Sequence, residues 1–464
     1  MNAALPEVKL RKAVPGPSGL PFIGMALAFF RDPIGVLVRA AAEYGPIFRL
    51  SLGRKSLVFL NDPVDVERVL RLDFKSFGQS ETHEQLLAPL LGRGVASVAD
   101  HAYWQELHKI YMPAFTPRML QRYFVQTARV TQSEVDQLDA LQRAGKPVEF
   151  YEFTRLGVFT ALTKTLFVRG VETSEVPAIL ELFDRSNAYM NARYLTNASA
   201  LPNLLPAVRG GKRSLEQIDA RVYELIGYRR AHRAEVAEDM LDTLIDARFS
   251  DGTALDDVQL RDNIMTLFFG GQETTPSAIT WAFGLLAAHP DKRERMLEEI
   301  DSVLGDRPPC FEDLAKLRYT DMVFDEAMRM YPAFSFLARE ALVDTQIRGF
   351  VIAAGTTIAF PGWTIHRNSA HWDDPEVFMP ERHDKDAKRG RAKCAFIPFG
   401  YGQRRCIGER VARIEAVLML AMISQRFLLE HVDGRLPEAR VQMSIKPVGQ
   451  MPMRIVPRQH PARS

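Results

Sequence analysis

Residues 399–408, which read Phe-Gly-Tyr-Gly-Gln-Arg-Arg-Cys-Ile-Gly, constrain the fold more than any other stretch of the chain. Gly400 and Gly402 can adopt positive φ angles, so the backbone between them can turn tightly under a flat group. We expect a helix to begin after Gly408, and its unpaired N–H groups would stabilise a negative charge on Cys406. The segment therefore predicts a tight loop that presents one cysteine thiolate at the start of a helix.

A single thiolate presented in this way suits the axial position of a haem iron, where sulfur donates electron density and favours O–O cleavage. Phe399 can shield the sulfur from water, and Arg404 can reach a haem propionate through a charge-assisted hydrogen bond. Gly408 lets the following helix start close to the macrocycle. A buried structural cysteine in a glycine-rich turn is the alternative, and it is the better interpretation of an isolated Gly-x-Cys pair.

The ten residues match every defined position of Phe-x-x-Gly-x-Arg-x-Cys-x-Gly, and in this the chain resembles the cytochrome P-450 family. The resemblance can be followed from about Pro15 to Met453. It implies a mainly α fold with a small β portion, organised as a flexible N-terminus (residues 1–14) and a single large domain (residues 15–464). It also implies haem b, bound between a long central helix and the cysteine loop, with Cys406 as the iron ligand.

The composition limits the partners and the cellular compartment that we expect for such a protein. Lysine and arginine number 59 against 57 acidic residues, which gives no reason to expect a nucleic-acid partner. Three cysteines are too few for a disulfide framework and fit a reducing cytoplasm. The apolar run from Leu20 to Phe30 is about a third to a half of the length that spans a bilayer. Without the N-terminal anchor of eukaryotic relatives, the chain resembles the soluble, bacterial type, with a cytoplasmic location and no stable membrane anchor.

Periodicity predicts where strands and helices lie. The runs 47–52 and 56–60 flank a Gly53-Arg54 turn and predict a β-hairpin. Apolar residues then recur at helical spacing from Ala102 to about Leu304. Strand signals return at residues 345–360, divided by Ala354-Gly355.

A long helix is predicted from Asp262 to Leu286, and it contains the sequence Gly-Gly-Gln-Glu-Thr-Thr-Pro at residues 270–276. Two internal glycines cost about 1 kcal/mol each relative to alanine, and a proline removes a backbone donor. The helix is therefore expected to be loosened there. The segment resembles the family's Ala/Gly-Gly-x-Asp/Glu-Thr motif, which implies that Thr274 hydrogen-bonds bound dioxygen and that Glu273 relays protons. Ordinary helix residues beside a packing glycine are the alternative.

Three arginines and a glutamate resemble the family's scaffold motifs. Glu326 and Arg329 stand at i and i+3 on one helical face. Residues 378–382, Phe-Met-Pro-Glu-Arg, resemble Phe-x-Pro-Glu-Arg, which implies a buried structural triad of Glu326, Arg329 and Arg382. Arg339 occupies the place of a further propionate-binding arginine.

One position departs from the family pattern Trp-x-x-x-Arg, whose two side chains contact haem propionates. This chain has Trp104 followed by His108 and Lys109. A neutral imidazole would hold a propionate more weakly than a guanidinium. Either His108 is protonated, or Lys109 substitutes for it, or the contact is lost; an exposed helix histidine is the alternative.

In the segments that resemble the family's substrate-contacting regions, the candidate wall residues are overwhelmingly apolar, and no arginine pair or cation-specific cage appears apart from Arg93. They imply a hydrophobic small molecule, with a terpenoid, steroid-like, fatty or polyketide skeleton of the kind found in secondary metabolism. Core packing is the commoner role for any one of these side chains. The candidate pocket residues are Leu87, Leu91, Met265, Phe269, Gly270, Phe334, Phe336, Leu337, Val448 and Met451.

Electrons are expected from a separate protein, because no nucleotide fingerprint or flavin domain follows the cysteine loop. A basic cluster precedes and surrounds the loop, formed by Lys385, Lys388, Arg389, Arg391, Lys393, Arg405 and Arg410. We hypothesise that this cluster docks an acidic ferredoxin or flavodoxin, which is in turn reduced by its own reductase. A solvated run of charges is the alternative.

The function hypothesis is a monooxygenase that inserts one oxygen atom of O2 into a hydrophobic substrate. A peroxide-driven or non-redox haem-thiolate enzyme is the first alternative, although such relatives usually lose the acid–threonine pair that this chain retains. A non-catalytic haem protein that binds a ligand is the second alternative.

Overall fold

The computed structural model describes residues 13–53, 55–167, 171–196, 206–232, 239–441 and 444–458. The chain forms two compact units, each assembled from segments that are distant in the sequence. We call the first the β-rich unit: Met1–Ser80, Phe334–Val377 and Arg389–Cys406. We call the second the helical unit: Glu81–Ala333, Phe378–Lys388 and Ile407–Ser464. The predicted single domain over residues 15–464 stays a prediction.

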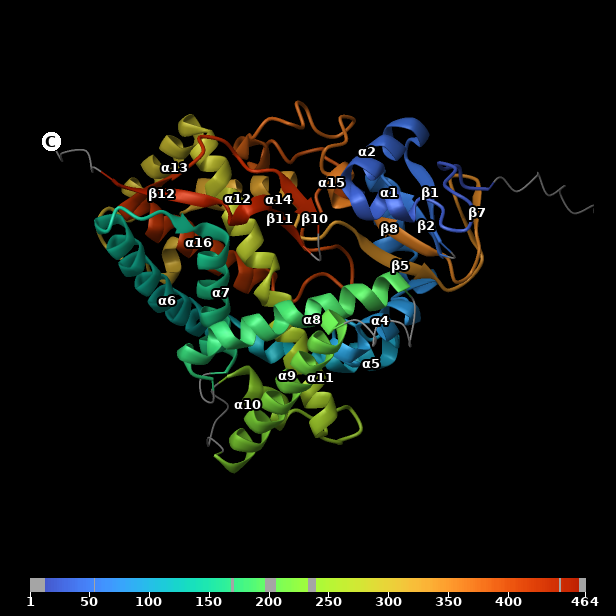
Figure 1. The fold of residues 1–464 in the computed structure, drawn as a ribbon, viewed down its shortest axis with the longest axis horizontal. Coiled ribbons are helices and arrows are strands. Elements are labelled where there is room, and N and C mark those ends of the chain that lie inside the picture. Colours follow the sequence, from blue (N-terminus) through green and yellow to red (C-terminus); the bar gives the residue numbers. More distant parts are fainter. Residues whose placement is uncertain are drawn as a thin grey trace, which may run out of the picture. The chain divides into compact units, whose positions relative to one another are not determined.

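A five-stranded sheet organises the β-rich unit, with the strand order β1-β2-β8-β5-β3 (Figure 1). β1 (Ile47–Leu52) and β2 (Lys55–Leu60) pair antiparallel, which confirms the predicted hairpin. β2 runs parallel to β8 (Thr357–Phe360), and β8 pairs antiparallel with β5 (Leu337–Ala341). β3 (Phe77–Gly78) closes the edge beside β5.

Short helices and a second hairpin complete this unit. The helices are α1 (Ala26–Arg31), α2 (Pro33–Tyr44), α3 (Pro63–Glu67) and α15 (Gly362–Ile365). β6 (Thr345–Ile347) pairs with β7 (Phe350–Ile352), so the strand signals predicted from residue 345 to residue 360 are confirmed. Phe48 and Phe59 stack at the centre with ring centroids 5.3 Å apart. Residues 1–12 of the predicted flexible N-terminus lie outside the described residues, whereas Val14 is buried in the core.

Helices make up most of the second unit. The described helices are α4 (Glu81–Leu91), α5 (His101–Tyr111), α6 (Pro117–Arg143), α7 (Phe150–Leu166), α8 (Val176–Thr196), α9 (Pro206–Ala231), α10 (Met240–Asp246), α11 (Asp257–Gln272), α12 (Thr274–Ala288), α13 (Pro290–Val303), α14 (Arg318–Met330) and α16 (Glu409–Arg426). β4 (Val148–Glu149), β12 (Pro452–Pro457) and β9 (Phe427–His431) form one small sheet. β10 (Ala439–Val441) and β11 (Ile445–Pro447) form another.

The core of the helical unit surrounds α12, whose residues are nearly all buried. Trp281 of α12 stacks flat on Tyr331, with ring centroids 3.7 Å apart. The Trp281 indole N–H and the Ser277 hydroxyl both donate to the Ile445 carbonyl, at 2.8 and 2.6 Å. These two buried hydrogen bonds attach strand β11 to α12 and so fix the position of its neighbours.

In the part of the chain that is described, no helix combines the length and the apolar character needed to cross a membrane.

Candidate active site

The cysteine loop has the backbone that its glycines predict. Gly400 and Gly402 have φ angles of 72° and 78°, and the Cys406 N–H donates to the Phe399 carbonyl at 2.8 Å. A Cβ atom at Gly402 would lie 2.0 Å from the Leu70 carbonyl oxygen, so only glycine fits there. Cys406 is exposed and forms no disulfide.

The expected helix behind the cysteine is α16, which begins at Glu409 with Gly408 as its N-cap. The unpaired N–H groups of its first turn are thus only a few residues along the chain from the sulfur. This confirms the predicted order of loop, cysteine and helix.

Arg339 offers a test of whether an anionic cofactor edge would fit the β-rich unit. It lies in strand β5, and its guanidinium donates to the Gln79 side chain at 3.2 Å and to the Ala338 carbonyl at 2.7 Å. Among the described residues it has no carboxylate partner, and burial alone lowers its pKa to about 10. A half-buried cation without a carboxylate partner among the described residues is suited to an anionic group such as a haem propionate.

The long central helix is interrupted at the predicted place. α11 ends at Gln272 and α12 begins at Thr274, and between them Glu273 has φ −126° and ψ −36°. The Thr274 hydroxyl donates to the Gly270 carbonyl at 2.7 Å. The loosening expected from two glycines and Pro276 is therefore confirmed as a helix break.

The two glycines of this segment have different surroundings. A Cβ atom on Gly271 would approach Leu162 of α7 to 2.6 Å, so this glycine lets two helices pack closely. A Cβ atom on Gly270 would meet nothing within 4 Å. Gly270 therefore faces open space beside the helix break, where a small ligand could lie.

Glu273 is buried and has three polar partners that sequence reasoning missed. Lys446 of β11 lies 2.7 Å from one carboxylate oxygen, which also accepts from Asn187 of α8 at 3.2 Å. The Ser444 hydroxyl donates to the other oxygen at 3.3 Å. Inside the unit the carboxylate thus accepts hydrogen bonds from an ammonium group and two neutral donors.

The surroundings of this ion pair are largely shielded from water. Tyr151 of α7 lies beside Lys446, whose ammonium nitrogen is 5.4 Å from the ring centroid. Burial, and then the charge of Glu273, raise the pKa of Tyr151 well above its usual value, so the phenol stays protonated. Arg155 adds a second fixed cation, paired with Asp184 at 2.7 Å.

The structure brings the predicted triad residues together at the end of α14. Arg329 donates to both oxygens of Glu326, at 2.7 and 2.9 Å, and Arg382 donates to one of them at 3.1 Å. The Met379 backbone N–H also donates to Glu326, at 2.9 Å. Burial alone would raise the pKa of Glu326, but its hydrogen bonds from His383 and Arg329 hold that pKa below its usual range.

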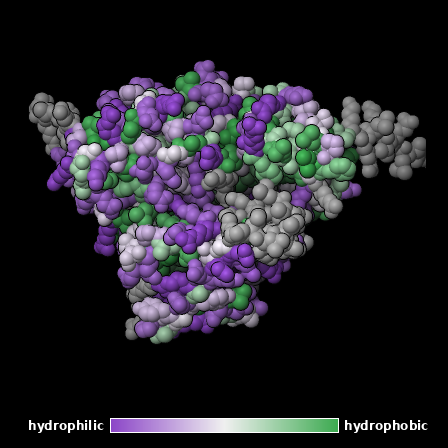
Figure 2. Space-filling view, viewed as in Figure 1, coloured by the Kyte–Doolittle hydropathy of each residue, from purple (hydrophilic) through white to green (hydrophobic). Residues whose placement is uncertain are grey.

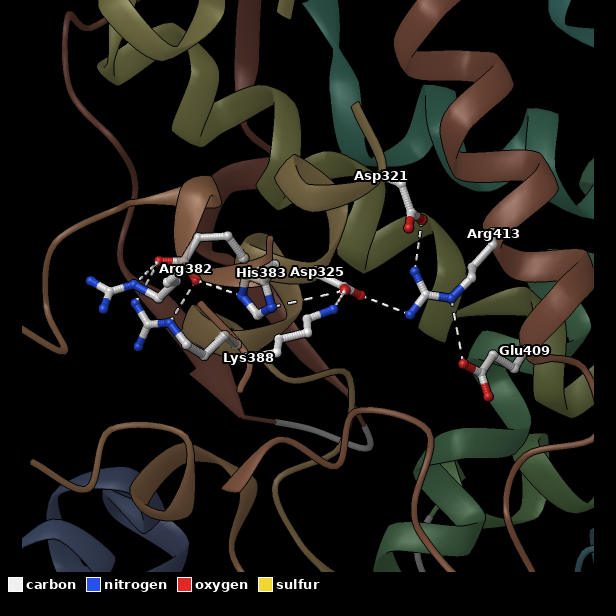
Figure 3. Close-up of polar contacts among 9 residues, drawn as sticks. Asp321, Asp325, Arg382, His383, Lys388, Glu409 and Arg413 are labelled. Carbon is white, nitrogen blue, oxygen red and sulfur yellow. Dashed lines mark hydrogen bonds and ion pairs between the residues drawn. The ribbon is translucent and has the colours of Figure 1, made fainter. Parts of the chain in front are cut away.

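His383 belongs to this cluster, although no sequence motif pointed to it. Its Nε2 lies 2.8 Å from Glu326, and its Nδ1 lies 3.8 Å from Asp325 (Figure 3). Burial lowers the pKa of His383 despite these two carboxylates. The imidazole therefore joins the triad to a second buried acid, Asp325.

Asp325 continues the network toward the helix behind the cysteine loop (Figure 3). It pairs with Arg413 of α16 at 2.8 Å and with Lys388 at 3.2 Å. Arg413 also pairs with Asp321 at 2.7 Å and with Glu409, in the first turn of α16, at 3.4 Å. The start of α16 is thus tied to α14 through Arg413 and the buried carboxylate of Asp325.

Helix α5 carries His108 at the position where the family pattern has an arginine. His108 of α5 lies beside Trp104, with the two rings tilted and their centroids 5.0 Å apart, and burial lowers the pKa of His108. Lys109 is paired with Glu106 at 2.6 Å. A protonated His108 and a substituting Lys109 are therefore both disfavoured, and the propionate contact at this position stays a prediction.

The candidate pocket residues fall into two groups. Leu91, Met265 and Met451 are completely buried; a Cβ atom on Gly284 would lie 2.7 Å from the Met451 sulfur, so this methionine packs closely over the glycine. Phe336 belongs to the aromatic core of the β-rich unit, 5.9 Å from Phe59. The others are partly or fully exposed: Leu87, Phe269, Gly270, Phe334, Leu337 and Val448.

A comparison with known proteins agrees with the cysteine loop and the broken helix: the family model described as cytochrome P-450 matches residues 14–451. The chain belongs to the cytochrome P-450 family. The solved haem domain of cytochrome P-450DA shares its fold, with a TM-score of 0.87 and 26% identity, covering 97% of this chain and 99% of the other.

Curated relatives of this P-450 come from bacteria and animals. A cyclooctat-9-en-7-ol 5-monooxygenase of Streptomyces melanosporofaciens is 29% identical, and the match covers 90% of each chain. A pentalenene oxygenase of Streptomyces avermitilis is 29% identical over 88% of this chain and 90% of its own. Cytochrome P-450 3A1 of Rattus norvegicus is 26% identical over 97% and 92%. The protein is thus a monooxygenase that uses haem b with an axial cysteine thiolate.

Proposed function

We propose that this P-450 oxidises a terpenoid-like polycyclic skeleton that is largely hydrocarbon, with electrons from a separate ferredoxin or flavodoxin. Two relatives carry the names of such substrates, pentalenene and cyclooctat-9-en-7-ol. Arg93, the arginine singled out in the candidate pocket segments, is engaged by Glu84 at 3.2 Å and lies over the Tyr103 ring. It is therefore occupied and gives no reason to expect an anionic substrate.

In this proposal Cys406 is the axial ligand, and Arg339, Arg404 and the Trp104–His108 pair face the propionates. Haem bound to a thiolate supplies the activation of O2 for insertion of one oxygen atom into a C–H bond. The protein's own task is to orient the substrate beside Gly270 and to deliver protons where they are needed. The observation that carries the proposal is the helix break, which sets an open glycine, a hydroxyl and a buried acid next to one another.

Thr274 and Glu273 take the proton-handling roles. Because the Thr274 hydroxyl donates its hydrogen to the Gly270 carbonyl, its oxygen lone pairs can accept a hydrogen bond from an incoming proton donor. Glu273 is the nearest acid along the chain, and Lys446 pairs with it at 2.7 Å. Delivery then requires the Glu273 side chain to leave Lys446, take up a proton and turn toward Thr274.

The redox partner is proposed to bind the basic residues around the cysteine loop. Part of this charge is engaged internally: Lys388 pairs with Asp325, and Arg391 lies over the Trp372 ring at 4.0 Å. Lys385 and Arg410 are exposed. If an acidic partner docks by charge, its reduction of the enzyme slows as ionic strength rises; a rate independent of salt would exclude this mode of docking.

The test begins with ligand titrations of the purified haem protein, followed in the Soret band. We expect a low-to-high-spin shift with polycyclic hydrocarbon alcohols and none with fatty acids of similar size. Turnover should require O2, a reductase and a ferredoxin, and Glu273→Gln should slow it by about a hundredfold. Turnover with hydrogen peroxide alone that Glu273→Gln leaves unchanged would instead support the peroxide-driven alternative.

A further inference from the structure

Two polar side chains of the β-rich unit are withdrawn from water in a molecule over whose visible face hydrophilic residues are widely spread (Figure 2). His366 is 0% exposed and Trp372 is 1% exposed. Both follow helix α15, in a turn where the Trp372 N–H donates to the Asn368 carbonyl at 3.1 Å. Because burial of an imidazole or an indole is costly without a hydrogen-bond partner, the partners of these two rings indicate their role.

The partners are backbone groups of one short segment that leads into the cysteine loop. The Trp372 indole N–H donates to the Ala395 carbonyl at 3.2 Å. The Ile397 N–H donates to Nε2 of His366 at 3.0 Å. Ala395 and Ile397 are themselves buried. The backbone of residues 395–397 is therefore held at two points by side chains from another segment of the unit.

The ring of Phe396 packs against both of these side chains. Its centroid lies 5.3 Å from that of His366, and 6.2 Å from that of Trp372 in an edge-to-face arrangement. Such packing restricts the rotation of each ring. The imidazole is therefore held at the angle at which it meets the Ile397 N–H.

The direction of the bond to His366 determines which form of the imidazole is present. A backbone N–H can only donate, so Nε2 is the acceptor and carries no hydrogen. The imidazole is therefore neutral, with its hydrogen on Nδ1. A ring without an acceptor at this place would leave the buried Ile397 N–H without its partner, a loss that shifts an equilibrium by roughly tenfold to a hundredfold.

Ile397 extends this constraint toward the sulfur. Its carbonyl accepts from the Gly400 N–H at 3.0 Å, and the Phe399 carbonyl accepts from the Cys406 N–H at 2.8 Å. Phe399 and Gly400 are neighbours in the chain. A displacement of Ile397 therefore moves the turn to which the backbone of Cys406 is bonded.

We propose that His366 is a positioning residue for the iron ligand: by accepting from the Ile397 N–H, it holds the cysteine loop where Cys406 can bind the haem iron. Trp372 supports the same segment through Ala395. This rests on the proposed role of Cys406 as the axial ligand. It goes beyond that role, because His366 lies outside the motif of residues 399–408 and acts through the backbone of Ile397.

The test compares variants of the full-length haem protein. His366→Phe keeps an aromatic ring and removes the acceptor, whereas His366→Gln supplies an amide oxygen that can accept in place of Nε2. An axial thiolate donates electron density to iron and thereby moves the absorption band of the reduced carbon monoxide complex to long wavelength. We expect the ratio of this form to the form without thiolate to fall by about tenfold or more in His366→Phe, and to return close to the wild-type ratio in His366→Gln.

The reduction potential of the haem gives a second measurement, which should rise in His366→Phe as electron donation from the thiolate weakens. His371→Phe removes a partly exposed imidazole from the same turn. It is the matched control and should resemble the wild type in both measurements.

Each other outcome would overturn the proposal. An unchanged band and potential in His366→Phe would exclude a positioning role, and equal losses in His366→Phe and His366→Gln would assign the effect to the shape of the ring. An equal loss in His371→Phe would assign it to the turn as a whole. If His366→Phe does not fold, His366→Met replaces it, since methionine matches glutamine in length and is only a weak acceptor. A wild type without the long-wavelength band would overturn the assignment of Cys406, and this proposal with it.

Discussion

Two buried carboxyl groups in the helical unit make a quantitative prediction about pH and stability. Glu415 of α16 and Glu134 of α6 are both buried. Gly157 of α7 leaves room for Glu134, since a Cβ atom there would lie 1.6 Å from its carboxyl oxygen. Burial raises the pKa of Glu415 to about 8. Burial, and then the charge of Glu415, raise the pKa of Glu134 well above its usual value.

The sign of the effect follows from proton binding. The pKa of the Glu415 carboxyl is near its ordinary value of 4.5 in the unfolded chain and about 8 in the folded protein, so between these pH values the folded state binds more protons. The free energy of unfolding therefore falls as pH rises through this window and levels off above it. At about 1.4 kcal/mol per pKa unit, the full cost is on the order of 5 kcal/mol.

Glu415→Gln keeps the shape of the side chain and removes the ionisation. We expect its unfolding free energy to lack this decline, so that the variant gains stability relative to the wild type from about pH 5 to about pH 9. Urea unfolding at a series of pH values, followed by circular dichroism, measures the difference. Glu298→Gln, on an exposed face of α13, is the control and should track the wild type. Parallel curves for Glu415→Gln and the wild type would refute the reasoning.

Three further predictions concern charges around the site. Lys446→Met should leave Glu273 without its counter-ion and cost about 3 kcal/mol of unfolding free energy, whereas Lys446→Met/Glu273→Gln should recover most of it in urea unfolding; equal losses would refute the coupling. Arg329→Leu should cost about 3–5 kcal/mol and lower the haem content of the purified protein, while His383→Phe should cost about 1–2 kcal/mol; equal effects would mean that the ion pair does not dominate. His108→Arg should retain haem as well as or better than the wild type when transfer to apomyoglobin is measured, and rapid haem loss would remove residue 108 from the propionate site.

Local chemistry made much of this molecule predictable. Glycine and proline at residues 270–276 predicted the helix break, because each weakens the helix through its own backbone. The hairpin at residues 47–60 followed from alternation and a turn, and the loop before Cys406 followed from glycines at positions that require positive φ. In all three cases the residues that determine the structure are neighbours in the sequence.

Partners from distant segments could not be predicted in the same way. His383 follows the recognised arginine of its motif, yet only the folded chain shows that it binds the Glu326 oxygen that Arg382 does not contact. In the sequence, Arg413 looks like an ordinary exposed charge on a helix. Its pairing with Asp325 depends on how α16 packs against α14, and packing leaves no local signature in a single sequence.

Lys446 shows why only part of the candidate site could be predicted from the sequence. It lies 173 positions after Glu273, in a short strand that a reader of the sequence would take for solvent-exposed. The Ile445 carbonyl is fixed to α12 by Trp281 and Ser277. Side chains alternate along a strand, so the residues on either side of Ile445 share one face, and both reach Glu273. Two hydrogen bonds to one backbone carbonyl thus determine which residues hold the proposed proton-relay acid. Substitutions at Trp281 should therefore alter the hydrogen bonds that Glu273 accepts.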